Sequence, residues 1–450
     1  MDLRDKAFEV LIIVDDRAEA EITVGTGRTA LTRFANSFIH QNVAEDKQWA
    51  RLKLVVDGRA ATGSTNRLDR DSLIRLVDET LEVTRLRPVD PDWPGLTPPT
   101  AWLTLEDDRY DPQTERSEPE TRAQVVKDFV DAGSSGPSGT GDDQLRAAGY
   151  CATKGWDVYF ANNLQHRAGG RASSAAVDAI HRTPTSDSRG WQFAPSIADI
   201  DGAAAGRLAA ERARAAANPV DLEPGRYEVV LEPACVADMM DFLADGFNAK
   251  TYSEGRSWVK PKAALLDESI DIWDDVNDPR AIGVSFDAEG TPKAQRVLVR
   301  EGVCRALVHD RRTAKRTGTR SSGHAVPGGE VSGPMATNLF LAGGEQSPEA
   351  LIADVERGLL VTDFWYTRIL DPKTQVVTGL TRNGTFLVEK GKITGAVRNL
   401  RFTQSYVEAL GPGNVLGLGD DARLYQMWGG WAHVPSLRLA NWNFTGGAKG

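Results

Sequence analysis

The stretch Gly379-Leu-Thr-Arg-Asn-Gly-Thr-Phe-Leu-Val-Glu-Lys-Gly-Lys-Ile393 places short apolar runs beside two turn signals, Asn383-Gly384 and Lys390-Gly391. Asn-Gly is a strong hairpin signal because both residues tolerate positive φ. Residues 318–450 around this stretch hold 21 of the 43 glycines of the chain. Glycine at this density favours tight turns over helices. We therefore expect a Gly-rich, β-dominated C-terminal domain over residues 221–450, with a hairpin at each of the two turn signals.

Residues 1–220 carry strand patterns that predict an antiparallel sheet. The apolar run Val10–Val14 is typical of a strand. Thr26-Gly27-Arg28 predicts a hairpin turn, because glycine between polar residues suits a tight connection. A second hairpin is expected over residues 155–179, with its turn at Ala168-Gly169-Gly170.

Helical patterns alternate with these strands. Apolar residues recur on one face of 71–86, and Pro119 is well placed to begin a helix that ends at Gly133. An Ala-rich helix is expected over 199–217, and residues 133–141 read as a flexible loop. The sequence thus predicts an α+β protein with an N-terminal α/β domain, 1–220, before the β-rich domain.

Within the C-terminal domain, one strand leads directly into a helix. Tyr227–Leu231 has the strand pattern, and Ala234–Ala244 has the helical one. Ala281–Phe286 and Gln295–Arg300 are expected to form a further hairpin.

Composition excludes several classes of function. The 450 residues include 53 Lys and Arg and 63 Asp and Glu, so the formal charge is −10. An acidic chain lacks the basic surface that is needed to bind a phosphate backbone, so we expect no direct nucleic-acid binding. No apolar window is long enough to span a membrane, and the first residues lack a signal-peptide pattern. Three widely spaced cysteines suit a reducing compartment, so we expect a cytoplasmic protein.

The common catalytic motifs are absent from the sequence. No G-x-S-x-G, P-loop or Rossmann G-x-G-x-x-G motif occurs, and the glycines of 411–419 read as a turn because Pro412 interrupts them. The histidines are scattered, with no two at i, i+4 spacing. Adjacent acidic pairs are typical of solvated surface. The residues therefore indicate no self-contained active site.

Several long signatures resemble the TldD/PmbA family, also called modulators of DNA gyrase or TldD/TldE metallopeptidases. Thr32-Arg-Phe-Ala-Asn-Ser-Phe-Ile-His-Gln-Asn42 is similar to a strand signature of that family. Ser321-Ser-Gly-His-Ala325 and the residues from Gly379 to Phe402 resemble its C-terminal domain. The segments occur in the family's order, and the resemblance covers essentially the whole chain.

The resemblance implies two kinds of subunit. TldD-like subunits bind zinc through H-E-x-x-x-H on a helix and a cysteine near the C-terminus, whereas TldE (PmbA)-like subunits lack these ligands. Here the equivalent helix carries four residues at the degenerate zinc-helix positions: Val236, Ala237, Met240 and Asp241. The last cysteine is Cys304. A catalytic zinc needs three protein ligands, which Val, Ala and Met cannot supply.

We therefore expect no catalytic residue, metal or cofactor in this chain, and zinc only in a TldD-like partner. The resemblance implies a non-catalytic TldE-like subunit of a TldD/TldE-type metallopeptidase complex that processes unfolded peptides. The partner would be a TldD-like subunit in a heterodimer, or a second copy in a homodimer. One alternative is a stand-alone peptide- or protein-binding regulator without proteolysis. Another is a homodimer with its own, unorthodox hydrolase site.

Candidate peptide-binding residues lie in two stretches: Arg320, Ser322, Gly323 and His324 in a Gly-rich loop, and Asn383, Arg398 and Asn399 near the predicted hairpins. The strand from Ile393 to Phe402 could hold an extended peptide by β-augmentation. In the alternative interpretation, the loop is a mobile surface segment with a solvated basic flank. That flank consists of Arg311, Arg312, Lys315 and Arg316.

Tryptophans crowd the end of the chain. Trp428, Trp431 and Trp442 lie within the last 23 residues. Such a density suits either a domain core or an interface anchor, and the family resemblance favours some of them meeting a partner.

Overall fold

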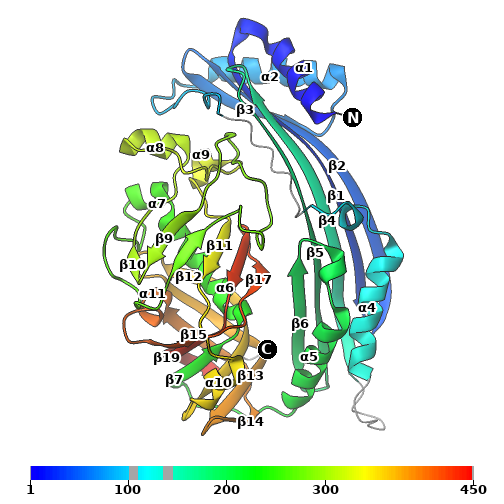
Figure 1. Cartoon of the computed structure of the whole chain (residues 1–450), viewed down its shortest axis with the longest axis vertical. Coiled ribbons are helices and arrows are strands. Elements are labelled where there is room, and N and C mark those ends of the chain that lie inside the picture. The colour runs from blue at the N-terminus through cyan, green and yellow to red at the C-terminus, as the bar shows by residue number, and fades with distance from the viewer. Residues whose placement is uncertain (1, 101–109, 135–144, 448–450) are drawn as a thin grey trace.

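The computed structural model describes residues 2–100, 110–134 and 145–447. The protein is α+β, with an antiparallel sheet in the N-terminal region and a β-rich C-terminal part, as predicted. Figure 1 shows the first sheet as a long curved layer beside the C-terminal part. Most of the loop predicted at 133–141 lies outside the described residues. No helix within the described ranges is long and apolar enough to cross a membrane.

The first sheet is antiparallel throughout, in the order β3-β2-β1-β4-β5-β6. Its strands are β1 (Glu19–Ala35), β2 (Phe38–Val56), β3 (Arg59–Thr65), β4 (Arg146–Asn162), β5 (Arg167–Arg182) and β6 (Asp187–Ala194). Its helices are α1 (Leu3–Val14), α2 (Arg70–Leu86), α3 (Pro112–Glu115), α4 (Pro119–Ser134) and α5 (Gly202–Ala215). α1 and α2 pack at one end of the sheet, and α4 and α5 pack toward the other (Figure 1).

Two of the strand predictions for this region are wrong. Val10–Val14 is the end of α1, whose buried residues Leu3, Ala7, Val10 and Val14 follow helical spacing. Thr26-Gly27-Arg28 lies inside β1, which continues to a turn at Asn36-Ser37, where both residues have positive φ. Glycine is needed at position 25 for another reason: a Cβ there would lie 2.5 Å from the Trp49 ring across the strand pair.

The other N-terminal predictions agree better with the structure. The helices at 71–86 and 119–133 are α2 and α4, and the Ala-rich helix is α5, which is shorter than the predicted 199–217. The 155–179 hairpin exists as β4 and β5, but its turn falls between Asn162 and Arg167, before the predicted glycines.

The C-terminal part contains two sheets. One has the order β10-β9-β8-β11-β18-β17, and in the other β12, β7, β19, β15 and β13 close into a ring because β12 also pairs with β13. The sheet that runs from β10 to β17 consists of β8 (Ile272–Asp274), β9 (Arg296–Arg300), β10 (Val303–Cys304), β11 (Asn338–Leu341), β17 (Arg423–Gln426) and β18 (Trp431–Val434). The sheet that contains the ring consists of β7 (Gly225–Leu231), β12 (Arg357–Asp371), β13 (Val376–Glu389), β14 (Lys392–Ala396), β15 (Leu400–Ser405), β16 (Val415–Leu418) and β19 (Leu437–Gly447).

Short helices connect these strands. They are α6 (Pro233–Ala244), α7 (Ala249–Ser253), α8 (Arg311–Thr317), α9 (Gly329–Ser332), α10 (Pro348–Ala353) and α11 (Tyr406–Ala409). α6 is the helix predicted after the strand at 227–231, and its apolar side packs into the largest buried cluster of the molecule. Trp442 is fully buried in that cluster, whereas Trp428 is 98% exposed.

Two hairpin predictions in this part are wrong. Residues 281–286 form no strand, and β9 pairs instead with β8 and β10. Asn383-Gly384 lies inside β13 at an irregularity in its pairing with β12, and it has positive φ at both residues. Lys390-Gly391 does form a hairpin turn, between β13 and β14.

The basic flank of the 320–329 loop contacts the N-terminal region, although Lys315 and Arg316 remain exposed. α8 docks against residues 90–96 of the N-terminal region, where Arg312 pairs with Asp90 and Arg316 pairs with Asp92. Arg311 and Lys315 donate to backbone carbonyls of the same segment. The four cations therefore join the C-terminal part to the N-terminal region.

Candidate functional site

A long open cleft lies between residues of β4, β5 and β6 in the first sheet and α6, β12 and β13 in the C-terminal part. It consists of two hollows of about 730 Å³ and about 660 Å³. Both are lined by Trp365, Tyr366, Arg382 and Asn383, so the hollows are continuous at these residues. We call the two together the inner cleft.

One buried cation sits where the two sides of the inner cleft meet. Arg189 on β6 binds Asp178 of β5 through two hydrogen bonds of 2.6 and 2.8 Å. The same guanidinium lies 3.1 Å from Asp363 of β12 and donates to the Tyr425 hydroxyl of β17 at 2.7 Å. Asn383 donates to Asp363 at 2.8 Å. These contacts fix the distance between the walls of the cleft.

The electrostatics of this cluster follow from burial and from the opposite charges. Burial acts to lower the pKa of Arg189, but Asp363 and Asp178 raise it well above its ordinary value. Burial raises the pKa of Asp363, although Arg189 and Asn383 oppose the shift. Arg189 is thus committed to two carboxylates and holds the cleft together rather than offering a free charge.

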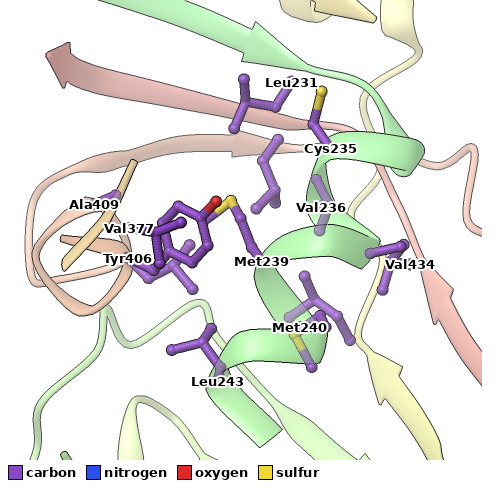
Figure 2. Close-up of a cluster of buried hydrophobic side chains, with 14 of the residues drawn as sticks. Leu231, Cys235, Val236, Met239, Met240, Leu243, Val377, Tyr406, Ala409 and Val434 are labelled. Carbon is purple, nitrogen blue, oxygen red and sulfur yellow. The ribbon is translucent and has the colours of Figure 1, made fainter. Parts of the chain in front are cut away.

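α6 forms the floor of the inner cleft. Figure 2 shows its core side, where Val236, Met239 and Met240 point into the buried cluster. Ala237, Asp238 and Asp241 instead line the cleft. Val236 and Met240, two of the degenerate zinc-helix positions, therefore serve the core, whereas Ala237 and Asp241 face the cleft.

Two carboxyl groups on this floor have a raised pKa. Asp238 accepts hydrogen bonds from Thr367 at 2.7 Å and from the Tyr406 hydroxyl at 3.1 Å, and burial raises its pKa to about 7. Burial also raises the pKa of Asp241, which accepts the backbone N–H of Trp428 at 3.3 Å. Cys235 points away from solvent, and burial raises the pKa of its thiol well above the ordinary value.

This donor set does not fit a zinc ion of the family's kind. Of the positions equivalent to H-E-x-x-x-H, only Asp241 offers an oxygen ligand, and the site has neither an imidazole nor an accessible thiolate. Across the part of the chain that the structure describes, no three His, Cys, Asp or Glu side chains gather in an arrangement for a metal.

Three of the predicted peptide-binding residues lie on the inner cleft. Asn383, Arg398 and Asn399 line its 660 Å³ hollow, and Arg398 pairs with Asp221 at 3.0 Å on the exposed rim. These three residues lie close together because β13 pairs with β14, and Arg398 and Asn399 follow in the connection from β14 to β15.

The other four predicted residues lie elsewhere, and His324 is not placed to contact a peptide. Its side chain is buried, with Nε2 3.1 Å from Asp274 Oδ1 and Nδ1 2.9 Å from the Ser322 hydroxyl. Burial acts to raise the pKa of Asp274, but the bond with His324 holds it below its ordinary value. Gly323 is buried with φ 74°, and Arg320 lies exposed outside the cleft. The His324–Asp274 pair thus anchors this part of the loop, while Ala325, Val326 and Pro327 line a small cavity elsewhere.

The predicted strand from Ile393 to Phe402 is two strands. β15 is paired on one side with β13 and on the other with β19, so it offers no open edge.

Sequence reasoning missed the residues that build the cleft. Asp178 and Arg189 lie on the consecutive strands β5 and β6, but Asp363 is 174 residues from Arg189, and no motif spacing connects the three. Asp238 and Asp241 did carry a signal, because their i, i+3 spacing places both on one side of α6. The exposed aromatics Trp365 and Tyr366 lie at an irregularity of β12 that periodicity does not reveal.

Comparison with known proteins identifies this architecture. The sequence model described as "PmbA/TldA metallopeptidase C-terminal domain" matches residues 224–446. A metalloprotease of Methanothermobacter thermautotrophicus is 28% identical over 44% of this chain and 44% of its own length. A metalloprotease TldD homolog of Haemophilus influenzae is 25% identical over 45% of this chain and 41% of its own. The matches thus span under half the length of these curated relatives.

The whole fold has a solved counterpart. The crystal structure of TldE from Thermococcus kodakarensis superposes with a TM-score of 0.86 and 16% identity, covering 98% of this chain and 99% of that one. The fold is therefore that of the TldE structure. The chain belongs to the TldD/PmbA family, through its metallopeptidase C-terminal domain.

Proposed function

We propose that this chain is a zinc-free, TldE-like subunit of a TldD/TldE-type metallopeptidase, which completes a peptide-cutting chamber without cutting peptides itself. The observation that carries the proposal is on α6. The positions that the sequence resemblance equates with H-E-x-x-x-H hold Val236, Ala237 and Asp241, and the inner cleft before this helix is open over both hollows. Such a cleft suits holding a substrate that another subunit cleaves.

The β6 edge supports a role in holding an extended peptide. Among the described strands, β6 pairs only with β5, and on its other side Asp187 and Arg189 line the inner cleft while β13 and β17 pack close by. A strand edge binds a peptide through backbone hydrogen bonds, which do not depend on the peptide sequence. This mode suits unfolded substrates of varied composition.

Exposed aromatic side chains support a partner or peptide contact at the mouth of the cleft. Trp365 is 47% exposed, Tyr366 is 65% exposed and Trp428 is 98% exposed, and all three line the 730 Å³ hollow. Large exposed aromatics are the residues most often found as binding hot spots. We propose that a TldD-like subunit, together with its bound peptide, covers them.

The test is reconstitution with a TldD-like protein that carries H-E-x-x-x-H from the same organism. We expect a stable complex with one zinc ion for each pair of subunits and cleavage of an unfolded peptide. This chain alone should neither cleave the peptide nor retain zinc after purification without chelator. About one tightly held zinc per chain in the isolated protein, or cleavage by it, would contradict the proposal.

The same experiment separates the alternative. A stand-alone regulator would bind peptide or protein with no TldD-like subunit and would form no complex with one.

The formal charge of −10 and three free, buried cysteines support a cytoplasmic protein that does not bind nucleic acid directly.

A further inference from the structure

Arg382 is a cation of the inner cleft whose side chain makes no ion pair or hydrogen bond with any described residue. It lies on β13 and lines both hollows. Its guanidinium carbon, Cζ, lies 4.4 Å from the centre of the Trp365 ring. Stacking of this kind orders a guanidinium without neutralising its charge. Arg189 is bound by two carboxylates, whereas Arg382 keeps its N–H donors for a ligand.

The other cations of the 660 Å³ hollow are already paired. Arg182 binds Asp187 at 3.2 Å, and Arg398 binds Asp221 at 3.0 Å. Among the described arginines that line this hollow, Arg382 is therefore the one whose charge is left for a ligand.

The two hollows differ in charge, and this difference decides where an anion can bind. The 730 Å³ hollow contains Asp238 and Asp241 on its α6 floor, and neither carboxyl group has a cationic partner among the described residues. A second anion there would meet like charge. In the 660 Å³ hollow it would meet the unpaired guanidinium of Arg382.

The wall that carries Arg382 and Trp365 is locally strained. Tyr366 has φ 54° and Asn383 has φ 58°, and each lies where the register between β12 and β13 slips. A positive φ is unfavourable for a bulky residue such as tyrosine. Strained residues persist where the surrounding structure holds them, and they cluster at sites that bind ligands. Both residues line both hollows, so the strain coincides with the joint of the cleft.

We propose that Arg382 binds a carboxylate group of the extended peptide in the inner cleft, supplied by the free C-terminus or by an acidic side chain. The inference rests on the proposed function, because it names the substrate class of the same cleft. β6 passes from Asp187 at the 660 Å³ hollow to Arg189 at the 730 Å³ hollow. A peptide whose C-terminal carboxylate lies on Arg382 and whose chain extends toward the α6 floor thus runs antiparallel to β6. Antiparallel pairing is the kind found throughout the first sheet.

The experiment measures the binding of short peptides to the purified full chain by isothermal titration calorimetry, without a TldD-like subunit. The probes are an acetylated penta-alanine with a free C-terminal carboxylate, its C-terminal amide, and the same amide with glutamate at the central position. Wild type should bind at least one of the two carboxylate peptides roughly tenfold more tightly than the neutral amide, because charge-assisted hydrogen bonds are the stronger ones. Which of the two binds tightly tells whether the carboxylate comes from the C-terminus or from a side chain.

Arg382→Gln should remove this preference, so that all three peptides bind about as the neutral amide binds wild type. Arg357→Gln is the matched control, since Arg357 lies on the neighbouring strand β12 but at the surface, where it binds Glu389. It should keep the wild-type preference. Circular dichroism checks that each variant is folded, and if Arg382→Gln does not fold, Arg382→Met against wild type decides.

Equal binding of the three peptides by wild type overturns the proposal, as does no binding of either carboxylate peptide at up to about 5 mM. A preference that survives in Arg382→Gln also overturns it. These outcomes are separate from that of the proposed function. Reconstitution with a TldD-like subunit can succeed while the carboxylate preference is absent, and a failure to assemble leaves the preference measurable on this chain alone.

Discussion

Arg189 Nη1 on β6 lies 3.1 Å from Asp363 Oδ2 on β12, and this ion pair joins the two walls of the inner cleft. The two side chains are 17% and 9% exposed. Asp178 binds the same guanidinium, so one cation compensates two carboxylates in a place that water barely reaches. Arg189 therefore helps to hold the two walls together, beside the aromatic contacts of Trp191 and Phe193 with Tyr425.

Replacing Arg189 by methionine should destabilise the protein strongly, because it leaves Asp178 and Asp363 buried without a cation. Removing one partner from a buried pair costs about 3–5 kcal/mol. Urea unfolding should show a loss of about 3 kcal/mol. Arg357→Met is the matched control: Arg357 pairs with Glu389 at the surface and should cost less than about 1 kcal/mol. Equal losses in the two variants would argue against the buried cluster.

The C-terminal tryptophans divide into core and surface. Trp442→Ala removes a fully buried ring and should cost about 3–5 kcal/mol. Trp428→Ala should change the free energy of unfolding by less than about 0.5 kcal/mol, since its ring is 98% exposed. In the reconstituted complex, however, Trp428→Ala should slow peptide cleavage or weaken assembly. Thermal melting and peptide turnover, measured on both variants, separate the two roles.

Helices were predictable from the sequence where their apolar spacing was clear, as in α2 and α6. α1 was missed because its last five residues form an apolar run that reads equally well as a strand. The length of β1, which contains Gly25 and Gly27, was missed because Thr26-Gly27-Arg28 suggested a hairpin turn. These glycines instead make room for a cross-strand tryptophan ring and a neighbouring backbone.

The inner cleft could be predicted only in part. Asn383 was found through its turn signal, but it has positive φ because β12 and β13 slip in register there, which aims its amide at Asp363. From the sequence, His324 was predicted to contact a peptide. In the fold its side chain is buried and bonded to Asp274, fifty residues earlier in the chain. Pairings between distant residues depend on the three-dimensional fold, and sequence spacing does not report them.

α8 should hold the N-terminal segment 88–97 in place through its cations. Replacing Arg312 and Arg316 together by alanine removes the ion pairs with Asp90 and Asp92, and it should expose that segment to limited proteolysis. Arg320→Ala, in the same basic stretch but exposed, is the control and should leave the cleavage pattern unchanged. Unchanged cleavage in the double variant would indicate that the backbone contacts of Arg311 and Lys315 suffice.

Asp238 should make the protein less stable as the pH rises. Burial raises the pKa of this carboxyl group to about 7 from an ordinary 3.8, so the folded state keeps the proton after the unfolded chain has released it. The stability it contributes is fully present below about pH 4 and is lost as the pH rises to and through about 7. At 1.36 kcal/mol for each pKa unit, the loss amounts to at most about 4 kcal/mol.

Asp238→Asn carries no titratable group at this position and still can accept hydrogen bonds from Thr367 and Tyr406 through its amide oxygen. Its free energy of unfolding should therefore decline less between pH 4 and pH 8 than that of wild type, and the gap between the two should widen toward pH 7 in the variant's favour. Urea unfolding at each pH measures the gap. Asp16→Asn, at an exposed position, is the control and should follow wild type. Parallel curves for wild type and Asp238→Asn would place the titrating carboxyl elsewhere, because only a group that differs between the two proteins can change the slope.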